Sequence, residues 1–219
     1  ASSDDLVRWQ PQREVKVMGG FPGVRNTWAP ETYWDTKKKQ WLIVWASSLQ
    51  AEDGRQAEGL RLWSAWTHDW QSFSQPEKFF DRGYPVIDAT IVHRELHGKK
   101  DLVMVFKDQT PDPLRYNERW VAGLTVAGPW GDASAPINES WSEGASVIHV
   151  RDQWIVFYDH YRPPRARFEA VETSDWIHWQ SADDKIALPD GAKHGSFFQV
   201  TKAEAQQLLS RHDPPAGQP

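Results

Sequence analysis

Three short apolar runs recur along the chain, at residues 40–47, 101–108 and 153–160. Each run follows a polar turn and combines β-branched with aromatic residues, a composition that predicts a β-strand. The starts of the runs lie 61 and 52 residues apart. Regular spacing of this kind indicates an internal repeat of small β units.

A further predicted strand precedes each run and begins with polar or aromatic residues. These entrances occupy residues 28–31, 87–90 and 143–146, and a fourth follows at 194–197. The intervals from Trp28 to Asp88, Glu143 and His194 are 60, 55 and 51 residues in turn. The entrances therefore keep a nearly constant phase within the repeat.

A turn motif, Ser/Thr-x-Asp followed by an aromatic residue, repeats as well. It occurs at residues 3–9, 67–73 and 173–179, and another turn with an aromatic residue, 127–130, takes its place in the middle repeat. Asp favours tight turns because its side chain bonds to the backbone two residues on. Strands in groups of four, repeated in this way, are typical of β-propeller blades.

The sequence thus predicts an all-β fold, an incomplete β-propeller with three whole blades over residues 26–80, 84–135 and 141–190. Residues 3–9 are expected to end a preceding blade, and residues 194–200 to form the first strand of a following one. Residues 1–200 form the propeller part in this interpretation. Residues 201–219 form a short helix over 202–209 and a disordered Pro-rich tail.

Composition excludes several classes of function. The formal net charge is −5, and the three lysines at 37–39 fit a solvated turn better than a nucleic-acid surface. No apolar run has the roughly 18 residues of a membrane span. There are no cysteines, and the chain begins at Ala1, as a mature secreted chain or a trimmed one would. The 14 tryptophans suit both core packing and the stacking of sugar rings.

Glu143 and Gly144 lie together at the start of a predicted strand, where neither residue type is favoured. Local rules of this kind tend to be broken at functional sites. The alternative is a solvated glutamate in a turn. The phase that Glu143 shares with the other entrances favours a functional carboxylate, because innermost strands of a propeller converge on one end of a channel.

The motifs together resemble glycoside hydrolase family 43, five-bladed propeller enzymes that act on arabinose- and xylose-containing polysaccharides. The matching pieces are residues 3–9, 28–31, 86–91, 106–108, 127–130, 141–144 and 194–196, in the order of the family. The resemblance implies that Glu143 is the general acid and that Asp88 tunes its protonation and orients the substrate. It places His194 near a calcium ion in the central channel. It implies substrate-binding positions at Trp28, Glu31, Lys107, Asp108 and Trp141.

These roles agree with the chemistry of glycosidic cleavage, which needs a protonated acid and a second carboxylate. A nearby carboxylate helps an acid to keep its proton. Alternatives remain for two positions, because Asp88 also suits an Asx-turn and His194 also suits a packed core histidine. Calcium prefers oxygen ligands, so an ion near His194 is expected to take most of its shell from water.

One departure from the family pattern is serious. The family's general base is the Asp of an Arg-Asp-Pro motif in the blade before Trp28, and this sequence has no Arg-Asp-Pro. The sequence therefore predicts an inverting arabinofuranosidase- or xylosidase-like enzyme completed by another segment, most simply in a homo-oligomer. A carbohydrate-binding propeller without catalysis and a protein-interaction scaffold are the alternatives. The substrate class favours a secreted or periplasmic location.

Overall fold

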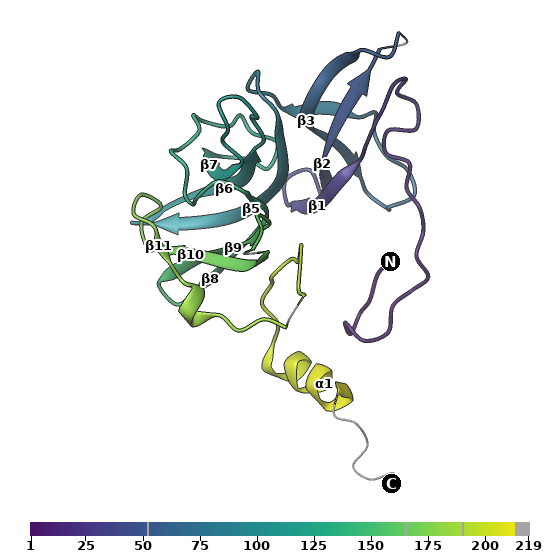
Figure 1. Cartoon of the computed structure of the whole chain (residues 1–219). Coiled ribbons are helices and arrows are strands. Elements are labelled where there is room, and N and C mark those ends of the chain that lie inside the picture. The colour runs from purple at the N-terminus through teal and green to yellow at the C-terminus, as the bar shows by residue number, and fades with distance from the viewer. Residues whose placement is uncertain (52, 165, 190, 213–219) are drawn as a thin grey trace. The chain divides into compact units, whose positions relative to one another are not determined.

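The computed structural model describes residues 1–51, 53–164, 166–189 and 191–212. The chain forms two compact units, one of residues 17–197 and one of residues 1–16 together with the segment from Phe198 onward. The larger unit contains all the strands (Figure 1). No helix in the described part of the chain has the length and apolar character needed to cross a membrane.

Blades 1 and 3 are four-stranded antiparallel sheets in sequential order. Blade 1 consists of β1 (Trp28–Asp35), β2 (Gln40–Gln50), β3 (Gln56–Thr67) and β4 (Glu77–Phe80). Blade 3 consists of β8 (Ser142–Val150), β9 (Gln153–His160), β10 (Arg167–Thr173) and β11 (Gln180–Ser181). The short 3₁₀ helix η1 (Asp183–Lys185) follows β11.

Blade 2 has three strands, β5 (Val86–Leu96), β6 (Lys99–Asp108) and β7 (Asn117–Gly123). An isolated bridge between Gly123 and Trp130 stands where a fourth strand would begin. The innermost strands β1 and β5 contact each other, as do β5 and β8. The prediction of an all-β fold with three blades is confirmed.

Strand alternation divides the residues of β6 between two cores. Leu102, Met104 and Phe106 pack into the core between blades 1 and 2. Val103 and Val105 pack into the core between blades 2 and 3. Because successive side chains of a strand point to opposite faces, Lys107 continues the row that faces blade 3.

Each innermost strand has a β-bulge near its start. The register against the second strand shifts between Trp28 and Glu31, between Ile87 and Thr90, and between Glu143 and Ser146. A residue with positive φ lies in each bulge: Ala29 at 45°, Asp88 at 53° and Gly144 at 68°. The sequence spacing matched Asp88 with Glu143, but the bulges show that Asp88 corresponds to Gly144, one residue later.

The strand predicted over residues 194–200 is absent from the described structure. A strand needs a partner for its ladder, and residues 194–197 pack against blade 3 instead. The ring of Phe197 stacks on Phe157 at a centroid distance of 3.8 Å. Residues 3–9 likewise form bends without a strand.

In the smaller unit, helix α1 covers Lys202–His212. Thr201 and Glu204 form a capping box at its start: the Thr201 backbone N–H donates to Glu204 Oε2 at 2.7 Å, and the Glu204 N–H donates to Thr201 Oγ1 at 3.2 Å. The predicted Pro-rich tail, residues 214–219, lies outside the described residues.

Candidate active site

Glu143 is the second residue of β8, and its side chain is 24% exposed. Its Oε2 accepts a hydrogen bond from Lys107 Nζ at 3.1 Å. The carboxylate is thus held on one side by a cation and reaches solvent on the other. A carboxyl group that is both oriented and accessible is what proton donation to a bound molecule requires.

Lys107 lies near the end of β6, and its side chain is only 1% exposed. Its Nζ also donates to Tyr161 Oη at 3.1 Å and lies 5.3 Å from the ring centroid of Tyr116. Burial lowers the pKa of Lys107, but Tyr161 and Glu143 outweigh burial, so the pKa is raised above its ordinary value. Lys107 therefore carries a positive charge at neutral pH.

Asp88 connects the bulge of β5 to the start of β8. Its Oδ2 accepts a hydrogen bond from the Gly144 backbone N–H at 3.1 Å and lies 3.7 Å from His194 Nε2. The side chain is buried. Asp88 therefore holds the backbone next to Glu143, and its negative charge is balanced by His194.

Asp159 in β9 is the cross-strand partner of Glu143 and is 2% exposed. Its Oδ2 accepts a hydrogen bond from the His194 backbone N–H at 3.0 Å and lies 2.9 Å from His194 Nδ1. Hydrogen bonds to Asp159 and then to Asp88 raise the pKa of His194 to about 10, against the opposing effect of burial. His194 is therefore an imidazolium between two carboxylates at neutral pH.

All four entrances line one small cavity of about 150 Å³, through residues 29–31, 88–89, 144–145 and 194–196. Ser196 Oγ donates a hydrogen bond to Glu31 Oε1 at 3.1 Å. Burial raises the pKa of Glu31, and the bond from Ser196 opposes this only in part. Glu31 and Asp88 thus line the same cavity as His194, and one carboxylate oxygen each of Glu143 and Asp159 lies within 4.8 Å of a His194 ring nitrogen.

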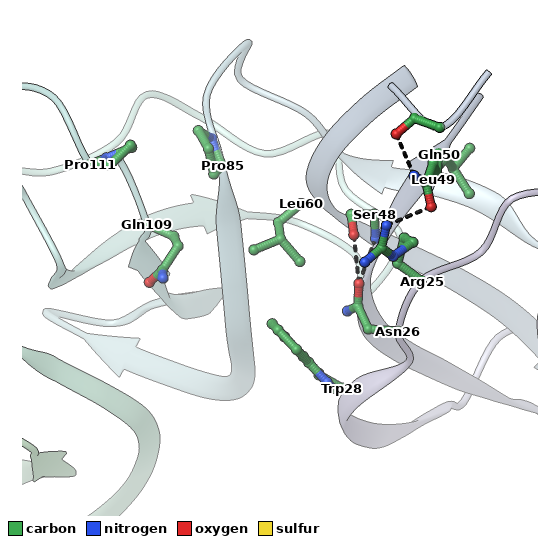
Figure 2. Close-up of a pocket in the computed structure, with 11 residues that line it drawn as sticks. Arg25, Asn26, Trp28, Ser48, Leu49, Gln50, Leu60, Pro85, Gln109 and Pro111 are labelled. Carbon is green, nitrogen blue, oxygen red and sulfur yellow. Dashed lines mark hydrogen bonds between the residues drawn. The ribbon is translucent and has the colours of Figure 1, made fainter. Parts of the chain in front are cut away.

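Trp28 lies apart from this cavity, in a larger pocket of about 500 Å³ between blades 1 and 2 (Figure 2). The residue is 51% exposed. Asn26 and Gln50 approach the pocket from blade 1, and Gln109 approaches from blade 2. An exposed indole beside amide groups is a surface suited to stacking and hydrogen bonding of a sugar.

Trp141 packs against two tyrosines that lie beside Lys107, and it also lines a pocket of about 440 Å³. Its ring meets the edges of Tyr116 and Tyr161 at centroid distances of 5.5 Å and 5.7 Å. Arg162 lies over the ring at 5.5 Å. Trp141 therefore supports the aromatic residues that enclose the lysine.

Lys107 and Asp108, both expected to bind substrate, have buried side chains in the structure. Asp108 is 0% exposed and points away from Lys107, because adjacent strand residues face opposite sides. Its Oδ2 is bound by Arg115 at 3.0 Å and by Arg119 at 3.1 Å. Asp108 thus orders the loop after β6, and substrate contact by these two residues stays a prediction.

Sequence reasoning missed three residues of the site: Asp159, Tyr161 and Glu118. Asp159 had a signal, since Tyr158-Asp159-His160 ends the third apolar run where Phe106-Lys107-Asp108 ends the second. Glu118 had none, because a single Glu after Asn117 in a short strand looks solvated. In the structure Glu118 is 0% exposed and is the cross-strand partner of Lys107.

The bladed fold and the carboxylates around the small cavity are those of a glycoside hydrolase domain of the propeller type. Residues 1–206 match the family described as "Probable glycosyl hydrolase domain", which is related to glycoside hydrolase family 43. The chain belongs to this family.

One curated relative is the alpha-L-arabinofuranosidase of Bifidobacterium longum subsp. longum. It is 29% identical over 103 residues, which cover 41% of this chain and 10% of the relative. The chain thus spans a small part of that protein.

Solved structures with a similar fold include three glycoside hydrolases. A thermostable family-43 glycoside hydrolase has a TM-score of 0.56 and 18% identity, covering 78% of this chain and 60% of its own. The exo-beta-1,3-galactanase of Phanerochaete chrysosporium has a TM-score of 0.59 and 12% identity, covering 83% and 42%. An endo-1,4-beta-xylanase from Bacteroides thetaiotaomicron has a TM-score of 0.54 and 16% identity, covering 83% and 64%.

Proposed function

We propose that this domain hydrolyses glycosidic bonds in arabinose- and xylose-containing plant polysaccharides or oligosaccharides, with inversion of configuration. Glu143 is the general acid: it donates a proton to the glycosidic oxygen as the carbon–oxygen bond breaks, and a water molecule takes the place of the leaving group. The observation that carries the proposal is the partly exposed Glu143 carboxyl, fixed by Lys107 beside the channel.

Asp88 is proposed to hold Glu143 in position through the neighbouring backbone. Its bond to the Gly144 N–H fixes the backbone that carries Glu143. Because His194 lies beside Asp88, the negative charge that Asp88 presents to Glu143 is reduced. We therefore assign Asp88 a role in orientation first and in tuning the protonation of Glu143 second.

The residues proposed to contact the sugar are Trp28 and Glu31. Trp28 offers an exposed ring in the 500 Å³ pocket, and Glu31 lines the channel cavity. Trp141 is proposed to border the site through its contacts with Tyr116 and Tyr161. The arabinose and xylose preference rests on the family resemblance and on the arabinofuranosidase relative.

The water-activating base of the family has no counterpart at its usual motif in this sequence. The chain covers 60% or less of two of the solved relatives, and another segment or another copy is proposed to supply the base. General base catalysis contributes about 10²–10⁴-fold, so the chain by itself is expected to be slow.

Aryl glycosides of arabinofuranose, xylose and galactose test the proposal, with and without azide. Azide attacks the anomeric carbon without needing a base, so it is expected to accelerate release by the wild type. Glu143→Gln is expected to lose about 10²–10⁴-fold on substrates with poor leaving groups. Glu139→Gln makes the same change at an exposed loop position and should behave as wild type. Equal release by wild type and Glu143→Gln would remove Glu143 from its role.

A second candidate function is carbohydrate binding without hydrolysis, favoured by the absence of the Arg-Asp-Pro motif. Calorimetric titration with arabino- and xylo-oligosaccharides distinguishes the two. Binding that is weakened in Trp28→Ala, with no release under any azide concentration, would support this alternative and contradict the enzyme.

For the channel we propose a calcium ion held mostly through water. Both ring nitrogens of His194 already face carboxylates, so the imidazole does not fit as a direct ligand. Glu31 and the walls of the 150 Å³ cavity leave room for a hydrated ion. Calorimetric titration of metal-stripped protein with CaCl₂, in a background of MgCl₂, tests this. Heat of binding would support the calcium site, and the absence of heat would contradict it.

We also propose that copies of the chain associate and complete the ring of blades. Trp34, outside the proposed sugar contacts, is 42% exposed, which is consistent with association. Light scattering tests this, and a monomeric mass at working concentration would contradict it.

A secreted or periplasmic location is proposed from the substrate class, because plant polysaccharides lie outside the cell. Fractionation of the native host with an antibody to the chain checks this. Recovery in the cytoplasmic fraction alone would contradict it.

A further inference from the structure

Glu118 is a buried carboxyl group that the proposed mechanism does not use. It lies in β7 directly across from Lys107 in β6, so the two side chains share the face toward blade 3. The residue is 0% exposed, and neither carboxyl oxygen has a hydrogen-bond partner within the described residues. A buried carboxylate without partners is very costly, so Glu118 is best accommodated with a proton.

The surroundings of Glu118 contain more acids than cations. The titratable groups that act on it from the neighbouring elements are Asp88 in β5, Lys107 in β6, Glu143 in β8, Tyr158 in β9 and His194 after β11. Asp88 and Asp159 share the positive charge of His194. Lys107 is then the cation that remains for both Glu118 and Glu143.

The contact between Lys107 and Glu143 opposes protonation of Glu143, which a general acid requires. The Lys107 ammonium bonds directly to Glu143 and favours the ionised carboxylate. A general acid must instead hold a proton when the substrate is bound. If another carboxylate takes over as the partner of Lys107, Glu143 is free to be protonated.

We propose that Glu118 is a positioning residue that shares one proton with Glu143, with Lys107 as their common counter-ion. In one form Glu143 is ionised and Glu118 carries the proton. In the other form Glu118 is ionised, Lys107 balances its charge, and Glu143 carries the proton that goes to the glycosidic oxygen. Both forms contain the same number of protons and the same net charge, so they are tautomers.

The shared proton has a consequence for the pH range of the acid. The ratio of two tautomers does not change with pH while the pair holds one proton. Burial, followed by the charge of Asp88, raises the pKa of Glu118 to about 8. Acid-dependent activity is therefore expected to persist up to about pH 8 and to fall above it. Without Glu118, Glu143 has no second carboxyl group with which to share the proton, so acid-dependent activity is expected to fall at a lower pH.

This inference rests on the proposed role of Glu143, and Glu118→Gln tests it. Gln keeps the shape and removes the exchangeable acid. On aryl glycosides with poor leaving groups, we expect the alkaline fall of kcat/KM to move down by at least one pH unit in Glu118→Gln. Activity at pH 7 should fall about tenfold or more. On dinitrophenyl glycosides, which leave without a proton, the variant should stay within about twofold of wild type.

Glu172→Gln is the matched control. Glu172 is also a buried glutamate, but it bonds to Lys185 and Gln180 on blade 3 and lies outside the site. Its pH profile should match that of wild type. An unchanged profile in Glu118→Gln, or an equal loss on both classes of leaving group, would overturn the proposal.

A second measurement does not require activity. In protein with ¹³C-labelled glutamate carboxyls, NMR titration is expected to show a group near pH 8 that is lost in Glu118→Gln. In Glu143→Gln, Lys107 becomes the partner of Glu118 alone, so this titration should move down by at least one pH unit. If it moves in a protein that hydrolyses nothing, the coupling stands and the proposed function fails. If it does not move, the coupling itself is wrong.

Discussion

The two interfaces between blades are built differently at the end that carries the entrances. Between blades 1 and 2, the apolar row of β6 reaches Phe106 and then ends in Asp108, whose buried carboxylate is paired with Arg115 and Arg119. Between blades 2 and 3, the apolar row of β6 ends after Val105 and is followed by Lys107, with Glu118 beside it. Both rows thus end in a buried charge, but the charge between blades 1 and 2 is neutralised by arginines of the same blade, whereas the charge between blades 2 and 3 is paired with the proposed acid, Glu143.

The largest effect is expected from breaking the apolar interface. Phe106 is 0% exposed and its ring lies 5.0 Å from that of Phe80. Phe106→Ala should reduce the free energy of unfolding by about 3–5 kcal/mol through lost burial and a cavity. Urea denaturation measures this. A loss below about 1 kcal/mol would mean that this interface is not tightly packed.

An intermediate effect is expected at the bulges. A Cβ on Gly144 would lie 2.9 Å from the His194 ring, at a φ of 68°. Gly144→Ala should cost about 1–3 kcal/mol and disturb His194. Ala29→Gly, at the equivalent place in blade 1, should change stability by less than about 1 kcal/mol, since Gly relieves the strain but loosens the unfolded chain. Equal effects at both bulges in urea denaturation would contradict the asymmetry.

A pH-dependent effect is expected from His194. Its pKa is raised in the folded state to about 10, so its contribution is complete below about pH 6.5 and is lost as the pH rises toward 10. His194→Gln should therefore lower the melting temperature at pH 6 more than at pH 10. The two curves should approach each other at high pH. A constant difference across this range would show that the charge of His194 contributes nothing.

The smallest effects are expected at the outer turns, which blades 1 and 3 share. Asp69 accepts backbone hydrogen bonds from Gln71 and Ser72, and these lower the pKa of Asp69 to about 2. Asp175 makes the equivalent bonds. Asp69→Asn and Asp175→Asn should each lower the melting temperature slightly at pH 7. The difference should vanish as the pH falls from about 4 to 2. A markedly larger effect in one blade would show that the turns are not equivalent.

The repeat and the blades could be predicted because strand patterns and turn chemistry are local. All three Asp turns form as expected, with Asp5, Asp69 and Asp175 each bonding to the backbone two and three residues on. The missing strand after His194 depends on a partner strand, which local patterns do not report. In place of a strand ladder, this segment is held by the stacking of Phe197 on the ring of Phe157.

The site was predicted less well because it depends on the register between strands and on the side of the sheet to which each side chain points. The sequence interval aligned Asp88 with Glu143. In the structure, Asp88 and Gly144 hold the same position within their bulges. Lys107 and Asp108 are adjacent in sequence, yet only Lys107 faces Glu143. Glu118 joins the site through cross-strand pairing with Lys107, and no sequence signal marks that pairing.

Because each bulge has a positive-φ residue at the same place, the side chain at that place can be exchanged between blades. One backbone shape already carries Ala29, Asp88 and Gly144, so its chemistry can be altered by a single codon without rebuilding a strand. Asp tolerates this conformation better than Ala does, because its short polar side chain bonds locally. Ala29→Asp would thus place an additional carboxylate on the channel wall that Ala29 now lines. Acidic side chains can thus be introduced or removed at one strand entrance without changing the backbone of the other blades.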